Sequence, residues 1–507
     1  MPEETSDLRA RRAPIEMSPG EFREAGHEMV DALASFLQSL RDRPVNRDES
    51  PSAVRSLLPP GGLPDGGADA RALLREAARL VVDHSLLNGH PRFFGYITSS
   101  AAPIGALADL LAAAVNPNLG GWQLSPIATE IELQCVRWIA EMLGLPPGAG
   151  GLLVSGGNVA NFTCFLAARR AKAGADLRAR GLPLESGRLR TYASTEAHTW
   201  IQKAVDLFGH GTDSIRWIGV DDRLRLDVAD LRARVEEDRA GGDRPFLVVG
   251  TAGSVGTGAV DPLPEIAEVA REHDLWFHVD GAYGAFATIL PDAPEELRGM
   301  AMADSVAADP HKWLYAPLEA GCALVRDPST LPDAFAYRPS YYHFESEQAD
   351  PEVNFYEYGM QNSRGFRALK VWLGLRHVGR AGYVRMISDD VRLARHLARL
   401  LRAEPEIEVF TQDLSITTFR YVPSDLDRAA EGAEPYLNRL NDALLHKLKS
   451  SGETFLSNVV VGGKFLLRAC IVNFRTSLAD IEALPGIVTR HGALARRSLA
   501  TDICADP

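Results

Sequence analysis

The sequence predicts an α/β protein whose large domain is built on a mostly parallel sheet. Apolar, strand-like runs alternate with helical ones from about residue 93 to residue 386. Only helical patterns precede this region, and strand-like runs mix with helices after it. We therefore expect a helical N-terminal segment over 1–92, a large domain over 93–386 and a small C-terminal α/β domain over 387–507.

The N-terminal segment contains two predicted helices. The first begins at Ser18 as the cap, with Pro19 at the first helical position and Glu21 three residues after the cap. A Pro- and Gly-rich stretch at 59–67 separates it from a second helix near 68–84. Such a pair exposes apolar surface, which either packs on its own chain or meets a second subunit.

The two domains are assigned element by element. The large domain has predicted strands at 151–154, 245–250, 274–280, 305–308 and 321–325, and predicted helices at 159–170 and 262–273. The small domain has predicted strands at 416–422 and 464–472, and predicted helices at 435–450 and 479–490. A mostly parallel sheet of this kind binds its ligands at the carboxyl ends of the strands.

Composition restricts the classes of partner. The net charge of −13 over 507 residues argues against binding to nucleic acid or to an anionic membrane. The five cysteines form no close pair, which favours reduced thiols over a disulfide framework or a zinc site. No apolar run approaches ~18 residues, and the N-terminus lacks an apolar signal core. We expect a cytoplasmic protein without a metal site.

Lys312 is the first candidate catalytic residue. It follows the apolar run 305–308 and is directly preceded by His311. A lysine at a strand end can lose its charge by desolvation and become a nucleophilic amine that forms a Schiff base. The alternative is a surface lysine whose stem lies on the core. A segment upstream favours the Schiff-base lysine over this alternative.

That segment is 274–284, which reads as a buried strand that ends in the carboxylate of Asp280 and is followed by small residues. A carboxylate at such a position needs a cationic or hydrogen-bonding partner. The protonated ring nitrogen of pyridoxal phosphate is one, because an aspartate keeps that ring an electron sink. Asp280 and Lys312 are expected at neighbouring strand ends.

A phosphate site is predicted at residues 155–158. The strand 151–154 leads into this glycine-containing turn, which includes Gly157 and Asn158, and a helix follows. Glycine lets the backbone approach a phosphate, and the first free N–H groups of a helix bind it. Alone such a turn is weak evidence, but together with the aspartate and the lysine it indicates a cofactor site.

Further motifs occur in a consistent order along nearly the whole chain. They are His90–Phe94, Ser125–Pro126 with Thr129–Glu132, Tyr192–Ser194 with Ala197–His198, Phe277–Asp280, Asp309–Trp313 and Arg364–Lys370. With these motifs the sequence resembles the group II pyridoxal-phosphate-dependent amino acid decarboxylases, the family of the aromatic-L-amino-acid decarboxylases. The resemblance implies the aspartate aminotransferase type I fold, pyridoxal phosphate as cofactor, and a homodimer with interlocked N-terminal segments.

The resemblance also implies roles for individual residues. Lys312 would hold the cofactor, Asp280 its ring nitrogen, and His198 would stack on the ring. His311 either lies at the cofactor or chiefly orients Lys312. The remaining cofactor-binding positions implied are Gly157, Asn158, Ser254 and Ala282.

A loop tyrosine would protonate the substrate carbon after carbon dioxide leaves. Tyr341 matches it, although the adjacent Tyr342 leaves the register open by one residue. Related aldehyde synthases tend to carry phenylalanine there, so Tyr341 favours simple decarboxylation over oxidative formation of an aldehyde.

The substrate is predicted less closely. Ser99 and Arg468 match positions expected at the substrate carboxylate, although either could be an ordinary polar contact. Asn118, Gly120 and Leu318 replace bulkier or aromatic residues of the animal enzymes. An aromatic L-amino acid is the first expectation, and aliphatic, basic or acidic amino acids and a non-catalytic scaffold are the alternatives.

Overall fold

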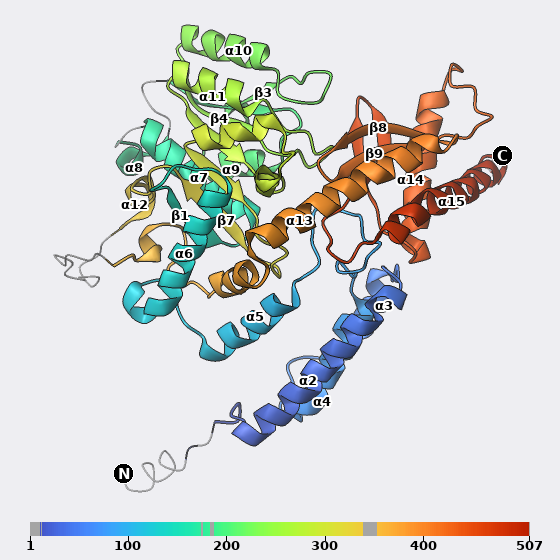
Figure 1. Ribbon diagram of the computed structural model, residues 1–507, viewed down its shortest axis with the longest axis horizontal. Coiled ribbons are helices and arrows are strands. Elements are labelled where there is room, and N and C mark those ends of the chain that lie inside the picture. The colour runs from blue at the N-terminus through green and yellow to red at the C-terminus, as the bar shows by residue number, and fades with distance from the viewer. Residues whose placement is uncertain (1–10, 12, 174–175, 183–186, 338–351, 506–507) are drawn as a thin grey trace.

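The computed structural model describes residues 11 and 13–505, apart from 174–175, 183–186 and 338–351. The N-terminal segment is helical, as predicted, and two of its helices lie side by side, parallel to each other, and extend away from the rest of the chain (Figure 1). Its elements are α2 (Pro19–Ser39), η1 (Leu40–Asp42), α3 (Pro51–Arg55) and α4 (Ala70–His84). Ser18 and Glu21 form the predicted capping box at the start of α2.

The large domain contains a seven-stranded sheet. In spatial order its strands are β1 (Gly150–Val154), β7 (Gly321–Val325), β6 (Ser305–Ala308), β5 (Trp276–Asp280), β4 (Arg244–Thr251), β2 (Leu189–Ser194) and β3 (Ile215–Ile218). The strands from β6 to β3 are parallel, whereas β7 runs antiparallel to both of its neighbours. The mostly parallel sheet is confirmed, and all five predicted strands are present.

Both faces of this sheet are buried because alternate residues of each strand pack into different cores. On β4, Val248 belongs to one apolar cluster while Leu247 and Val249 belong to the other. The helices and 3₁₀ turns of this domain are α5 (Pro103–Val115), η2 (Trp122–Leu124), α6 (Pro126–Met142), α7 (Gly157–Ala173), α8 (Asp176–Arg180), α9 (Trp200–Leu207), η3 (Thr212–Ser214), α10 (Val228–Ala240), α11 (Leu263–Glu272), η4 (Ala285–Ile289), η5 (Glu295–Met302), α12 (Thr330–Phe335) and η6 (Phe355–Glu357).

The small domain has a four-stranded antiparallel sheet, in the order β10-β11-β9-β8. Its elements are α13 (Ala368–Ala403), β8 (Ile407–Asp413), β9 (Ile416–Tyr421), α14 (Ala433–Ser451), β10 (Ser457–Val461), β11 (Lys464–Cys470) and α15 (Leu478–Ala505). α13 runs from the large domain to the small one, with a kink at Gly379 (Figure 1). The predicted domain boundary at residue 386 therefore falls inside this helix.

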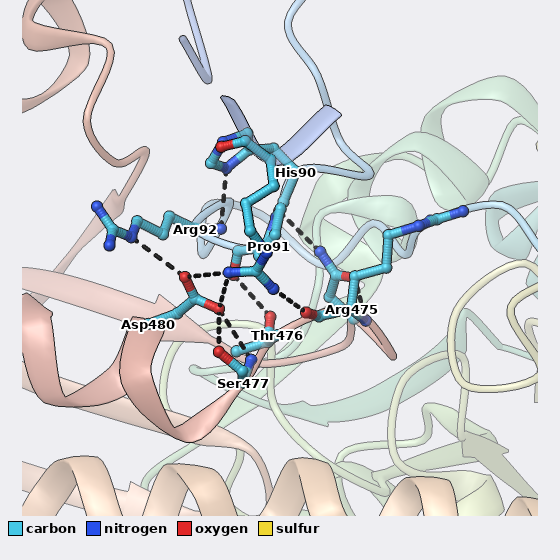
Figure 2. Close-up of polar contacts among 9 residues, drawn as sticks. His90, Pro91, Arg92, Arg475, Thr476, Ser477 and Asp480 are labelled. Carbon is cyan, nitrogen blue, oxygen red and sulfur yellow. Dashed lines mark hydrogen bonds and ion pairs between the residues drawn. The ribbon is translucent and has the colours of Figure 1, made fainter. Parts of the chain in front are cut away.

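A polar cluster ties the N-terminal segment to the start of α15 (Figure 2). The Asp480 carboxylate accepts hydrogen bonds from Arg92, 3.2 Å away, and from the backbone and hydroxyl of Ser477. Arg41 of η1 donates to both oxygens of the same carboxylate at 2.9 Å. Thr476 adds a hydrogen bond to the carbonyl of Pro91. We call Arg41, Arg92, Ser477 and Asp480 the Asp480 latch.

In the part of the chain that the structure describes, no helix combines the length and the apolar character needed to cross a membrane. The histidine, cysteine and acidic side chains of the same residues form no group of three or more that could hold a metal ion.

Candidate active site

A cavity of about 450 Å³ opens where β4, β5 and β6 end. The large domain supplies most of its wall, including the strand ends and the first turn of α7. The hairpin of β10 and β11 supplies the remainder. The residues that line it include Tyr96, Ile97, Gly157, Asn158, Asn161, His198, Val255, Asp280, Ala282, Tyr283, Asp309, His311, Lys312, Ser457, Val459 and Arg468.

Lys312 lies in the turn that follows β6. Its backbone N–H donates to the carbonyl of Asp309 at 2.9 Å, which folds the chain back into the cavity. The Nζ atom lies 3.2 Å from Oδ2 of Asp309, and only 17% of the side chain is exposed. The amine is thus held in a partly desolvated position beside a carboxylate, where it can react with a ligand in the cavity.

Asp280 is the last residue of β5, which pairs in parallel with β6. The prediction that Asp280 and Lys312 belong to neighbouring strands therefore agrees with the sheet order. Oδ2 of Asp280 accepts a hydrogen bond from the indole nitrogen of Trp200 at 2.8 Å, and Oδ1 accepts one from the backbone N–H of Ala282 at 3.1 Å. The carboxylate is buried and is fixed in one orientation by these two donors.

His198 lines the same cavity. Its Nδ1 accepts a hydrogen bond from the backbone N–H of Trp200 at 3.2 Å, so in the neutral ring the proton belongs on Nε2. Burial lowers the pKa of His198, although the nearby charge of Asp280 opposes this shift. The ring is therefore neutral at neutral pH, which suits a flat apolar contact with an aromatic ligand.

The first turn of α7 forms a cradle at the cavity floor. Gly157 and Asn158 begin this helix, so their N–H groups have no partner within it. A Cβ on Gly157 would lie 2.6 Å from Oδ2 of Asp309, and only glycine avoids that contact. Because free N–H groups at a helix start bind anions, this cradle can hold a phosphate.

His311 is buried between the cradle and the lysine. Its Nδ1 lies 2.6 Å from the carbonyl oxygen and 3.2 Å from the backbone nitrogen of Ala320, so the ring is held against that residue. Its Nε2 lies 3.7 Å from Oδ2 of Asp309. Burial lowers the pKa of His311. This arrangement supports both parts of the expectation, since the ring lines the cavity and also braces the residue before Lys312.

The residues that surround this cavity fit pyridoxal phosphate. Lys312 could hold its aldehyde, Asp280 its ring nitrogen, and the start of α7 its phosphate. The start of α7 supports this fit most directly, because residue 157 has no room for a Cβ and the first N–H groups of the helix are available to a phosphate. Each of these groups lines one cavity, although they come from segments far apart in the sequence.

Two predicted positions do not reach the cavity wall. The hydroxyl of Ser99 donates to the carbonyl of His311 at 2.7 Å. The hydroxyl of Ser254 pairs with that of Thr257 at 2.9 Å, and the neighbouring Val255 lines the cavity instead. Both serines satisfy their hydrogen bonds within the chain and act, at most, through the segments that they hold.

Ala282 and Arg468 do line the cavity, as predicted. Arg468 is buried and donates from Nη1 to Ser457 at 2.9 Å and from Nε to the carbonyl of Gly256 at 3.2 Å. Its Nη2 has no partner among the described residues. Tyr341 and Tyr342 lie outside the described residues.

Sequence reasoning missed three contributors. Asp309 belongs to the motif of Lys312, and a carboxylate directly after a buried strand is the signal that could have identified it. Trp200 lies two residues after His198 and gave no signal of its own. Asn161 lines the cavity on α7, and its Oδ1 lies 2.7 Å from Nε2 of the buried His278.

Comparisons with known proteins agree with this geometry. Residues 51–422 match the conserved domain of pyridoxal-dependent decarboxylases. An aromatic-L-amino-acid decarboxylase of Bacillus atrophaeus is 33% identical over 92% of this chain and 94% of its own. A phenylacetaldehyde synthase of a Rosa hybrid cultivar is 30% identical over 94% of each chain. The crystal structure of Oryza sativa TDC with PLP and tryptamine is 27% identical, covers 95% of this chain and 99% of its own, and has a TM-score of 0.88.

Proposed function

The chain belongs to the pyridoxal-dependent decarboxylase family, and on this premise we propose that it converts an aromatic L-amino acid into its amine and carbon dioxide. Pyridoxal phosphate is the cofactor of this carboxy-lyase family. The observation that carries the proposal is the convergence of Lys312, Asp280 and His198 on one cavity beside the helix start at Gly157.

Each of these residues has a proposed task. When bound, pyridoxal phosphate supplies a protonated ring that accepts electrons from the substrate carbon. Lys312 would hold its aldehyde and Asp280 its ring nitrogen. His198 would lie against its ring, and the N–H groups of Gly157 and Asn158 would hold its phosphate.

The substrate would occupy the part of the cavity between the cofactor groups and the β10–β11 hairpin. Tyr96, Ile97, Val255 and Val459 give this part an apolar wall, which supports an aromatic side chain. Arg468 is proposed to bind the substrate carboxylate, because its Nη2 is buried without a protein partner in the described chain. An aromatic substrate is also consistent with the relative named an aromatic-L-amino-acid decarboxylase.

A second candidate outcome is oxidative formation of an aldehyde. The phenylacetaldehyde synthase among the relatives supports testing it. Tyr341 favours the amine, since a tyrosine hydroxyl can protonate the substrate carbon and phenylalanine cannot.

The test is a product assay on the purified protein loaded with pyridoxal phosphate. Each proteinogenic L-amino acid is supplied separately, and amine, carbon dioxide, aldehyde and hydrogen peroxide are measured together. Amine and carbon dioxide in equal amounts from phenylalanine, tyrosine or tryptophan support the proposal. Stoichiometric aldehyde and peroxide establish the second candidate, and turnover restricted to basic, acidic or aliphatic substrates overturns the aromatic assignment.

A second copy of the chain is the proposed partner. Val30, Leu33 and Leu37 on α2 are between 41% and 45% exposed, and Leu107 and Leu110 on α5 are more than half exposed. Apolar helix faces of this kind are usually buried in an interface. Light scattering after size exclusion should give a dimer mass for wild type and a monomer for Leu33→Asp with Leu37→Asp. Leu207→Asp, which changes an exposed leucine on α9, is the control and should leave the mass unchanged.

A further inference from the structure

α13 contacts the segment that follows the reactive lysine through two side chains, two helical turns apart on one face. Oδ2 of Asp390 accepts hydrogen bonds from the indole nitrogen of Trp313 at 3.1 Å and from the hydroxyl of Tyr315 at 2.7 Å. The hydroxyl of Tyr383 donates to the carbonyl of Leu314 at 3.2 Å. All three residues after Lys312 are therefore attached to this one helix.

We propose that Asp390 is a positioning residue: it holds the Trp313–Tyr315 segment on α13 and so determines how tightly Lys312 retains pyridoxal phosphate. The inference rests on the role proposed for Lys312. Asp390 itself does not line the cavity and acts only through the segment that it holds.

The held segment has a backbone that needs external support. Tyr315 has φ of 53°, a left-handed conformation that non-glycine residues adopt at a cost. Its hydroxyl is held by Asp390, and its carbonyl accepts the N–H of Ala102 at 2.8 Å. Without the carboxylate, the hydroxyl loses its partner in a fully buried place, and the strained backbone can relax.

A shift of this segment would reach the cavity by two routes. Lys312 is the residue directly before Trp313. The Trp313 ring also packs on the ring of Tyr283, with centroids 4.8 Å apart, and Tyr283 lines the cavity. Asp390 thus controls both the lysine and one part of the cavity wall.

Asp390 is a buried carboxylate, and its burial costs folding free energy. It is 2% exposed, and no lysine or arginine forms a salt bridge with it in the described chain. Burial raises its pKa to about 7, against the opposing hydrogen bonds of Tyr315 and Trp313. A buried carboxylate without a cation destabilises the folded chain. The geometric constraint on the lysine segment is the benefit that offsets this cost.

The side-chain amide of asparagine is a weaker substitute for this carboxylate. An asparagine can accept the hydrogen bonds of Trp313 and Tyr315 only through a neutral oxygen, which binds them less strongly than an ionised carboxylate does. Asp390→Asn keeps the size of the side chain, removes a buried charge and weakens this pair of hydrogen bonds.

The experiment measures binding of pyridoxal phosphate to the cofactor-free full-length protein, by titration of the visible absorption of the bound cofactor. Asp390→Asn and Tyr315→Phe should each raise the dissociation constant by about tenfold or more. The double variant should bind the cofactor no more weakly than the weaker-binding of the two single variants, because both changes act on the same hydrogen bond between Tyr315 and Asp390. Asp389→Asn is the matched control, since Asp389 is half exposed and pairs with Arg392 on its own helix.

Thermal unfolding of the cofactor-free variants separates positioning from folding. Asp390→Asn should melt close to wild type at pH 8, because the removal of a buried charge offsets the weaker hydrogen bonds to Trp313 and Tyr315. A dissociation constant within twofold of wild type for both single variants overturns the proposal. So does a loss of affinity that parallels a loss of melting temperature. Should Asp390→Asn fail to fold, Tyr315→Phe, which keeps the ring, decides the question alone. If the wild-type protein binds the cofactor but turns over no substrate, the proposed function fails. The dissociation constants of the variants still test the role of Asp390 in that case.

Discussion

Trp200 binds both Asp280 and His198: its indole nitrogen donates to Oδ2 of Asp280 at 2.8 Å, and its backbone N–H donates to Nδ1 of His198 at 3.2 Å. One residue therefore fixes the orientation of the two side chains expected on the edge and the face of the cofactor ring. Because only the indole contact depends on the Trp200 side chain, the two effects can be separated by mutation.

Trp200→Phe should weaken the hold on Asp280 while leaving the backbone contact to His198. We expect turnover to fall by roughly 10–100-fold, since removal of one preorganised donor typically costs somewhat more than this at a transition state. Steady-state kinetics measure the effect. Trp217→Phe, at a partly exposed tryptophan of β3, is the control. An unchanged rate would mean that the Ala282 N–H alone orients Asp280.

Lys312→Ala should abolish covalent retention of pyridoxal phosphate. Wild-type protein is expected to keep a visible absorption band after desalting, whereas the variant should lose it because no other amine is placed in the described cavity wall. Lys172→Ala, at a lysine paired with Asp274 far from the site in sequence, should keep the band. A band that survives in Lys312→Ala would assign the cofactor to another lysine.

Gly157→Ala should disrupt the phosphate cradle. The new Cβ would lie 2.6 Å from Oδ2 and 3.1 Å from Oδ1 of Asp309, which cannot move without breaking its contact with Lys312. We expect the dissociation constant for pyridoxal phosphate to rise by about tenfold or more, corresponding to ~1.4 kcal/mol. Gly365→Ala, where an added Cβ meets nothing within 4 Å, is the matched control. Equal affinities for the two variants would exclude the helix start as the phosphate site.

Asp480→Asn should loosen the N-terminal segment by weakening the Asp480 latch. Burial alone would raise the pKa of Asp480, but hydrogen bonds from Ser477 and the charge of Arg41 outweigh it and lower the pKa. The carboxylate therefore stabilises the fold above the ordinary aspartate pKa of about 4, and this contribution is lost as the pH falls through the lower folded-state pKa.

We expect Asp480→Asn to lose about 1–3 kcal/mol at pH 7, with the difference from wild type disappearing in acid. Melting curves followed by circular dichroism across the pH range measure it. Asp425→Asn, which breaks an exposed pair with Arg496, is the control and should change the melting temperature much less than Asp480→Asn does. A difference between Asp480→Asn and wild type that persists below pH 3 would assign the effect to packing rather than to charge.

Tyr341→Phe should still bind the cofactor but make less amine. A correctly placed general acid contributes roughly 10²–10⁴-fold, and phenylalanine has no hydroxyl to donate a proton. Amine formation should fall by that factor, while aldehyde, ammonia and peroxide become measurable in the presence of oxygen. Tyr342→Phe is the control for the one-residue register. Wild-type amine production by Tyr341→Phe would make Tyr342 or His198 the candidate donor.

Local pattern was enough to predict the strands that carry the site. The observed strands β5 and β6 are buried along their whole length, and the predicted bounds 274–280 and 305–308 match theirs within two residues. The antiparallel direction of β7 was not predictable in this way, because strand direction depends on the path of the chain around the sheet. The predicted boundary at residue 386 lies within α13, because a change of domain leaves no mark on a continuous helix.

Individual contacts were predicted less well than elements. Ser254 and Val255 are neighbours in sequence, and the turn that places Val255 in the wall turns the hydroxyl of Ser254 toward Thr257. A one-residue difference of this kind depends on local backbone geometry. Trp200 and Asp309 contribute through long-range hydrogen bonds and ion pairs, which become visible only when separate strand ends are brought together.

The β10–β11 hairpin gives the cavity a wall that is synthesised last. A ribosome completes Lys312, Asp280 and the α7 cradle well before it reaches Ser457–Val459 and Arg468. Domains generally fold as units in the order of synthesis. A nascent or prematurely terminated chain would thus hold the cofactor-binding residues before the hairpin completes the substrate part of the wall, and the closed cavity would form only after the hairpin has joined the fold.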